Sequence, residues 1–160
     1  MALKKPEQNP SAARSAVMRA VRSADTRPEM TVRRTLHAMG YRYRLHRRDL
    51  PGSPDIVFPG RRKVIFIHGC FWHGHDCARG ARMPAANASY WRSKIARNMA
   101  RDQATMAALA AAGWQALVVW ECELKQRLRP ALEARLKAFL DGAETQAAAP
   151  RLRPGAAPEK

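Results

Sequence analysis

A ten-residue run near the middle of the chain, HGCFWHGHDC at residues 68–77, constrains the fold more than any other segment. It holds three of the five histidines and two of the three cysteines, and the third cysteine lies far along the chain, after an apolar segment. Structural zinc prefers a closed tetrahedral shell of nitrogen and sulfur ligands. The spacing therefore predicts a zinc site with the ligands Cys70, His75, Cys77 and Cys122. Spacing alone leaves His73 or His68 open as the nitrogen ligand, and three buried, inert thiols are the alternative.

The number of cysteines also bears on the compartment. Three cysteines cannot all pair within one chain, so thiols or a metal are favoured over a disulfide framework. Residues 1–10 are polar and lack the apolar core of a secretory leader. No apolar stretch approaches the roughly 20 residues that a membrane helix needs. We therefore expect a cytoplasmic protein with no membrane partner.

The balance of charges indicates a polyanionic partner. The 160 residues include 29 Lys and Arg against 13 Asp and Glu, which gives a formal net charge of +16. An excess of this size favours nucleic acid ahead of an anionic membrane surface. The hydrophobic fraction of 46% argues against disorder of the whole chain, because it can supply a buried core.

The pattern predicts one folded domain at residues 11–141, preceded by a flexible arm at 1–10 and followed by a disordered tail at 142–160. A capping box at residues 26–29 begins a helix that ends near Gly40. The other expected helices are 11–22, 90–112 and a last one that begins at Pro130. The expected strands are 41–46, 56–58, 63–67 and 114–120, with the last two in the core of the sheet.

The order of these elements predicts an α/β fold with a mixed β-sheet flanked by helices. Residues 63–120 form a strand–helix–strand unit that is long enough for a right-handed parallel crossover. The strands before it are joined by short loops, so they should be antiparallel to one another.

Asp55 is the candidate catalytic carboxylate. It stands at the head of an apolar strand, where metal-dependent nucleases commonly hold Mg²⁺ against a scissile phosphate. The alternative is an Asp that only closes its loop. His68 and His73 follow the next strand, and either imidazole could move a proton or stabilise charge on a phosphate. Each could instead be a zinc ligand or an ordinary loop residue.

Aromatic and polar side chains near this loop suggest contact with DNA bases. Phe71 and Trp72 lie between candidate zinc ligands, where a stiffened loop could push a wedge into stacked bases, although they could equally cover the edge of the sheet. Trp91, Lys94 and Asn98 follow at helical spacing, and Lys and Asn suit hydrogen bonds to base edges. A solvated helix face is the alternative for these three.

The motifs LPGSPD at 50–55, VIFIHGCFWH at 64–73 and VVWEC at 118–122 resemble the very-short-patch mismatch repair endonucleases (Vsr). The likeness covers roughly residues 14–140. It implies a fold similar to the type II restriction endonucleases, a structural Zn²⁺ and a catalytic Mg²⁺. It also implies a nick 5′ to the thymine of a T·G mismatch left by deamination of 5-methylcytosine, followed by repair of a short patch. The implied enzyme is a bacterial monomer that acts on double-stranded DNA, with mismatch-repair proteins such as MutL as partners.

The resemblance also implies roles for single residues. Asp55 and the main-chain carbonyl of Ile67 hold Mg²⁺, and Ile67 stands where the family has Thr. His73 is catalytic, His68 supports the same phosphate chemistry, and Glu29 is an acidic residue near the metal waters, although its place in the capping box gives it a structural role as well. The remaining implied sites are the zinc ligands Cys70, His75, Cys77 and Cys122, the intercalating Phe71, Trp72 and Trp91, the mismatch-reading Lys94 and Asn98, and the minor-groove residues Met18 and Val21.

Two other functions fit the residues. A zinc-stabilised DNA-binding protein that recognises distorted duplex without cutting it would keep the basic surface and the aromatics but would not need Asp55. A sequence-specific restriction nuclease would cut matched duplex. A nicking assay with Mg²⁺ on T·G and matched duplexes separates the three.

Overall fold

The computed structural model describes residues 25–45 and 47–142. The predictions for the arm, for the helix at 11–22, for Met18 and Val21, and for the tail from residue 143 lie outside the described residues. Among the described residues, no helix is both long enough and apolar enough to cross a membrane.

The described elements follow the expected order, and three short 3-10 turns join them. Their bounds are α2 (Arg27–Ala38), β1 (Arg44–Leu45), β2 (Ile56–Phe58), η1 (Pro59–Arg61), β3 (Lys63–His68), α3 (Ala88–Ala111), β4 (Gln115–Trp120), η2 (Glu121–Leu124), η3 (Gln126–Leu128) and α4 (Arg129–Leu140).

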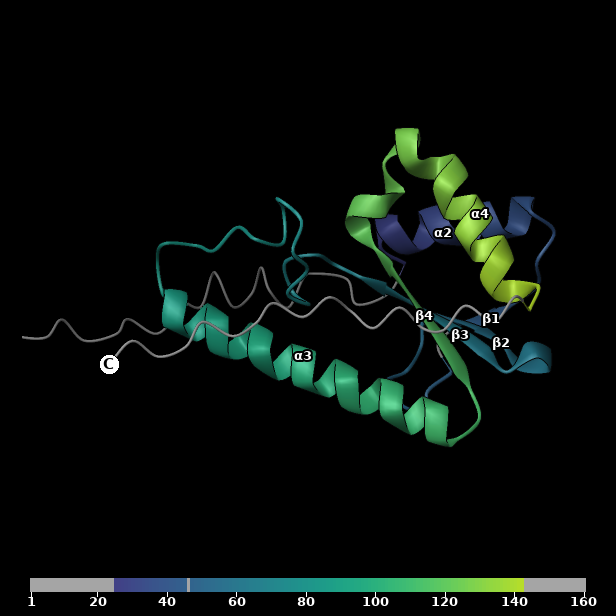
Figure 1. The fold of residues 1–160 in the computed structure, drawn as a ribbon, viewed down its shortest axis with the longest axis horizontal. Helices are drawn as coiled ribbons and strands as arrows, with labels where there is room; N and C mark the ends of the chain where they lie inside the picture. Colours follow the sequence, from purple (N-terminus) through teal and green to yellow (C-terminus); the bar gives the residue numbers. More distant parts are fainter. Residues whose placement is uncertain (1–24, 46, 143–160) are drawn as a thin grey trace, which may run out of the picture.

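The four strands form one mixed sheet in the order β1-β2-β3-β4. The pairs β1–β2 and β2–β3 are antiparallel, whereas β3 and β4 are parallel and joined through α3. The predicted parallel crossover and the antiparallel start of the sheet are both confirmed. Helices lie on both sides of the sheet, with α2 and α4 on one face and α3 on the other (Figure 1).

Two strands differ from the expectation. The strand expected at 41–46 is reduced to Arg44–Leu45, because its only partner is the three-residue β2. The segment 114–120 was expected as a core strand, but β4 lies at the edge of the sheet and Val119 is its only buried residue. An apolar strand can lie at an edge when helices cover both of its faces, as happens here.

Each face of the sheet has its own buried core. One core joins Ile56, Ile65 and Val119 to apolar residues of α2 and α4. The other core lies on the α3 face of the sheet. It contains Val64 and Phe66 of β3 together with Leu109 of α3, which is fully buried. Neighbouring residues of a strand point to opposite faces, so β3 contributes alternately to both cores. Its last residue, His68, lies on the α3 face.

Candidate active site and metal centre

The carboxylate of Asp55 lies at the end of β3. Its Oδ2 accepts a hydrogen bond from the backbone N–H of Ile67 at 2.7 Å. Antiparallel pairing of Ile56 with Ile65 brings the start of β2 beside the end of β3, which explains why residues 12 apart in the chain meet. Asp55 therefore lies against the residue whose carbonyl was expected to share Mg²⁺ with it, and next to His68.

His68 and His73 are brought together as a stacked pair. Their ring centroids are 3.8 Å apart and the ring planes differ by 11°. His73 Nδ1 lies 2.5 Å from Asp102 Oδ2, a carboxylate on α3. One ligand atom from each of these three residues lies within 4.8 Å of the others, so the group has the geometry of a proton-transfer or cation-binding cluster.

The two imidazoles differ in environment. His68 is 7% exposed, and its ring also contacts Phe66 and Trp120. Burial, together with the adjacent His73, lowers the pKa of His68 to about 4, so this imidazole is neutral near pH 7. His73 is partly exposed and has the carboxylate partner. Of the two, His73 is therefore better suited to carry a proton.

The Cys/His cluster is assembled as expected. Ligand atoms of the four residues lie within 4.8 Å of one another: Cys70, His75, Cys77 and Cys122. His75 Nδ1 lies 3.6 Å from Cys122 Sγ, and its ring stacks on Trp120 with centroids 4.3 Å apart. His75 is therefore the nitrogen donor of the set, and His68 and His73 belong to the other cluster.

The donors fit a soft or borderline cation. Three sulfurs and one imidazole nitrogen are the ligand set of a structural zinc site. Burial raises the pKa of Cys70 to about 12, so this thiol needs a bound cation to ionise. The cluster can hold a metal ion. A bound ion would link the loop after β3, which carries three of the donors, to Cys122 after the end of β4.

The aromatic residues form one group next to these clusters. Phe71, Trp72 and Trp91 contact each other edge to face, with centroids 5.1 to 5.8 Å apart. All three are only partly buried, so they are neither core residues nor fully solvated. Tyr90, which is 49% exposed, extends the group through its contact with Trp91.

Lys94 and Asn98 both contact this aromatic group. The Lys94 ammonium lies 5.2 Å from the ring centroid of Trp72 and 5.7 Å from that of Trp91. Asn98 Nδ2 donates a hydrogen bond to the carbonyl of Trp72 at 2.9 Å. The expected common face of Trp91, Lys94 and Asn98 is confirmed, and Asn98 also holds the backbone of the aromatic loop.

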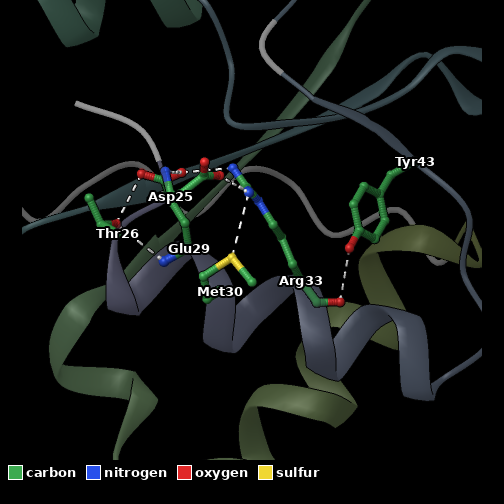
Figure 2. A network of polar contacts seen from close by, with 6 residues as sticks. All are labelled: Asp25, Thr26, Glu29, Met30, Arg33 and Tyr43. Atoms are coloured by element: carbon green, nitrogen blue, oxygen red, sulfur yellow. Dashed lines mark hydrogen bonds and ion pairs between the residues drawn. The ribbon is translucent and has the colours of Figure 1, made fainter. Parts of the chain in front are cut away.

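Glu29 lies in a separate network at the start of α2 (Figure 2). Its Oε1 accepts a hydrogen bond from the Thr26 hydroxyl, and its Oε2 accepts from the backbone N–H of Asp25 and from Arg33 Nη2. Thr26 Oγ1 in turn accepts from the N–H of Glu29, so the predicted capping interaction is confirmed. Glu29 is 4% exposed, and its carboxylate is held by Arg33 of α2 and by the two residues that precede the helix.

Sequence reasoning missed Asp102, Arg33 and Tyr90. Asp102 lies four residues beyond Asn98 on α3, so the same helical spacing that links Lys94 to Asn98 continues to it. That spacing was the available signal. Arg33 lies one helical turn after Glu29, which is likewise the spacing of a possible ion pair.

A carboxylate at a strand end, a histidine pair with its own aspartate and a cluster of half-exposed aromatics on a strongly basic chain are typical of an enzyme that cuts DNA. Comparison with known proteins also indicates an enzyme that cuts DNA, and it identifies the family. The family model described as "DNA mismatch endonuclease Vsr" matches residues 8–79. Because close relatives of nearly full length agree with this match, the chain belongs to the Vsr family of DNA endonucleases.

Three relatives illustrate the match. The "Type II nicking enzyme V.XorIIP" of Xanthomonas oryzae pv. oryzae is 59% identical over 125 residues, which cover 78% of this chain and 90% of that protein. The "Type II nicking enzyme V.NmeAIP" of Neisseria meningitidis is 44% identical over 114 residues, 71% of this chain and 81% of its own. The "DNA mismatch endonuclease Vsr" of Escherichia coli is 40% identical over 134 residues, 82% and 85% of the two chains.

Proposed function

We propose that this Vsr-family nicking endonuclease cuts one strand 5′ to the thymine of a T·G mismatch produced by deamination of 5-methylcytosine, and so starts very-short-patch repair. The observation that carries the proposal is that Asp55 lies at the same end of the sheet as the cluster of His68, His73 and Asp102. A DNA-binding protein that does not cut would have no use for a histidine pair oriented by a carboxylate. The names of the relatives support both the mismatch and the nicking parts.

Asp55 and the Ile67 carbonyl would hold Mg²⁺, which would stabilise negative charge on the phosphate undergoing hydrolysis. The side chain at position 67 has no part in that contact, so Ile in place of Thr is compatible with it. The oxygen of Asp55 that accepts from the Ile67 N–H keeps the carboxylate at the strand end.

His73 would transfer the proton during hydrolysis. Asp102 at Nδ1 leaves Nε2 to face the substrate and stabilises the imidazolium when it forms. His68, neutral and stacked on His73, would fix the ring plane and donate one hydrogen bond to a phosphate oxygen. Glu29 was also expected to act near the metal waters; that role stays a prediction beside its observed bonds in α2.

Recognition would come from the aromatic group. Phe71, Trp72 and Trp91 would enter the base stack at the mismatch, and Lys94 and Asn98 would contact base edges. Met18 and Val21 would lie in the minor groove. The aromatic loop begins and ends at residues of the Cys/His cluster, for which we propose structural Zn²⁺. A metal-stiffened loop supports insertion, because it loses little conformational entropy on binding.

We further propose a restriction-endonuclease-like domain at residues 11–141 that acts as a monomer in the bacterial cytoplasm. The mixed sheet with helices on both faces supports the fold, and the assembly of the whole site from one chain supports the monomer. Contact with mismatch-repair proteins such as MutL belongs to the same proposal, supported by the relative that is named as a DNA mismatch endonuclease.

The test is a nicking assay with Mg²⁺ on two duplexes that differ only in a T·G or C·G pair. We expect one nick, 5′ to the mismatched thymine, and none in the matched duplex. Asp55→Asn should bind the T·G duplex like the wild type yet fail to nick it, since the shape is kept and the metal loses a charged ligand. Cutting of the matched duplex would indicate a restriction nuclease, and binding by the wild type without nicking would indicate the DNA-binding alternative.

A further inference from the structure

We propose that three exposed arginines at the β1 edge of the sheet and in the turn that follows it, Arg42, Arg44 and Arg48, bind the phosphate backbone of the DNA beside the nicked position. We call them the arginine edge. The proposal rests on DNA as the substrate and is independent of the T·G preference.

Two members of the arginine edge, Arg42 and Arg44, lie on the same face of the sheet as the catalytic histidines. Arg44 pairs with Val57, which packs in the α3-side core, and paired residues of neighbouring strands share a face. Tyr41 and Tyr43 pack instead against the opposite core, so the alternating Arg42 points to the α3 side. His68 lies on the α3 face as well, through its contact with His73 and thereby with Asp102 of α3.

The chain direction brings the arginine edge toward the active site. Leu45, the last residue of β1, pairs with Ile56, the residue after Asp55. The chain therefore leaves β1 at the catalytic end of the sheet, and Arg48 lies in the turn that follows. Arg42 and Arg44 extend back along the sheet from that point. Side chains two apart on an extended chain are about 6.6 Å apart, so the charges of Arg42 and Arg44 are spaced along the chain and not clustered.

The guanidinium groups of the arginine edge can bind an anion, because no carboxylate of the described residues pairs with them. Arg47, in the same segment, is held by the carboxylate of Asp49 through two hydrogen bonds. In the part of the chain that the structure describes, neither Arg44 nor Arg48 has a carboxylate partner, and Arg42 makes only a 3.4 Å bond to the Tyr41 carbonyl. Phosphate oxygens supply what these guanidinium groups lack, because Arg binds phosphate with two parallel hydrogen bonds.

A second explanation of exposed charge on an edge strand is protection against pairing with another chain. It predicts a different result. Removal of the charges would then cause self-association and leave DNA binding unchanged. The position beside the catalytic end and on the catalytic face favours DNA, since protection of an edge requires neither.

The experiment compares four full-length proteins in binding to T·G and matched duplexes over a range of salt concentrations. They are the wild type, the triple variant Arg42→Gln/Arg44→Gln/Arg48→Gln, the same triple change to Lys, and a control, Arg34→Gln/Arg127→Gln/Arg129→Gln. The control removes the same charge from exposed positions on α2, η3 and α4, elements of the opposite face. The Lys variant keeps the charge and reports on any loss of fold.

We expect the Gln variant of the arginine edge to reduce the salt slope of log K by about 2 to 3, at about 0.9 for each lost phosphate contact. Both duplexes should weaken by the same factor, and the nicking rate at saturating DNA should stay as in the wild type. The Lys variant should keep most of the slope. An unchanged salt slope, an equal loss of slope in the control, or self-association with normal DNA binding would each overturn the proposal. Absence of nicking by the wild-type protein would overturn only the proposed function.

Discussion

At the scale of single residues, the histidine pair shows how neighbours give two identical side chains different properties. His68 is buried against Phe66 and Trp120, so burial lowers its pKa to about 4. His73 lies next to it but is bonded to Asp102, 29 residues further along the chain. The first environment keeps an imidazole neutral, and the second orients a ring for proton transfer.

The first prediction concerns this orientation. Asp102→Asn should lower kcat for nicking by on the order of 10²-fold, because the amide can hold the wrong tautomer of His73 and cannot stabilise its charged form. KM for T·G duplex should change little, since Asp102 contacts His73 at Nδ1 and Nε2 is the nitrogen that would face the DNA. Single-turnover nicking with a DNA titration separates the two quantities.

Asp102→Glu serves as the rescue, because a carboxylate on a longer arm should recover part of the rate. Asp141→Asn, a change at an exposed carboxylate beyond the end of α4, serves as the matched control and should nick normally. If Asp102→Asn changed only KM, the bond to His73 would have no part in the chemical step.

At the scale of elements, the loop between β3 and α3 depends on long-range bonds. It contains no helix or strand between His68 and Ala88, so its shape comes from the Cys/His cluster and from the bond between Asn98 and the Trp72 carbonyl. The fourth donor, Cys122, follows β4, which pairs with β3 in parallel. The parallel pairing explains why residues more than 40 positions apart meet.

The second prediction concerns the metal of this loop. About one zinc per chain should copurify, and Cys122→Ser should lose it, because a structural site needs its full ligand shell. The variant should also be much less stable, since binding energy at such a site is folding energy. Metal analysis and thermal unfolding measure the two effects.

A conservative change elsewhere, such as Ser93→Ala at an exposed position of α3, should leave the metal content unchanged and the stability nearly so. A metal-free Cys122→Ser protein with the stability of the wild type would show that the cluster is a set of inert thiols.

The start of α2 is a second element whose stability depends on a buried ion pair. Glu29 and Arg33 have side chains only 6% and 7% exposed, and their atoms Oε2 and Nη2 are 2.8 Å apart. Asp25, in the left-handed region at φ 58°, donates its N–H to the same carboxylate and pairs with Arg33 through its own side chain (Figure 2). The network therefore holds the entry of the chain into the helix.

The third prediction tests this pair. Arg33→Met should reduce the free energy of unfolding by about 3 kcal/mol, because it leaves the Glu29 charge buried without its ion-pair partner. The double change Glu29→Gln/Arg33→Met should cost clearly less, since the charge that loses its partner is then only that of Asp25, which is 62% exposed. Urea unfolding of the three proteins gives the values. Equal losses in the single and double variants would show that the ion pair contributes packing alone.

At the scale of the whole molecule, the net charge and the aromatic group should contribute differently to DNA binding. A net charge of +16 attracts any duplex, and this attraction weakens steeply with salt. The aromatic group at the end of the sheet offers a local and mostly uncharged contact, with Lys94 over three of its rings. Affinity and discrimination should therefore respond to different substitutions.

The fourth prediction follows from that separation. Trp72→Ala, with zinc retained, should reduce the preference for T·G over matched duplex more than it reduces binding to matched duplex. Opening a base step costs a few kcal/mol and least at a mismatch, so a wedge contributes mainly to the difference between the two. Competition binding at two salt concentrations measures both terms. Equal weakening of the two duplexes would show that Trp72 makes a generic contact.

Much of the molecule could be read from local sequence. The bounds of α2 follow from its cap residues and the start of α4 follows from Pro130, and the loop of the Cys/His cluster follows from the spacing of Cys70, His75 and Cys77. These features depend on residues close in the chain, whose conformational preferences and spacing are visible without the fold.

Only the tertiary structure decided the rest. It paired His73 with Asp102 and left His75 for the metal cluster, a choice that spacing had left open. It placed β4 at the edge of the sheet and Arg44 of β1 on the sheet face that carries the histidine pair. The physical reason is the same in each case: a strand or helix shows which of its faces is apolar, but which partner covers that face, and so which distant polar groups meet beside it, depends on how all the elements pack together.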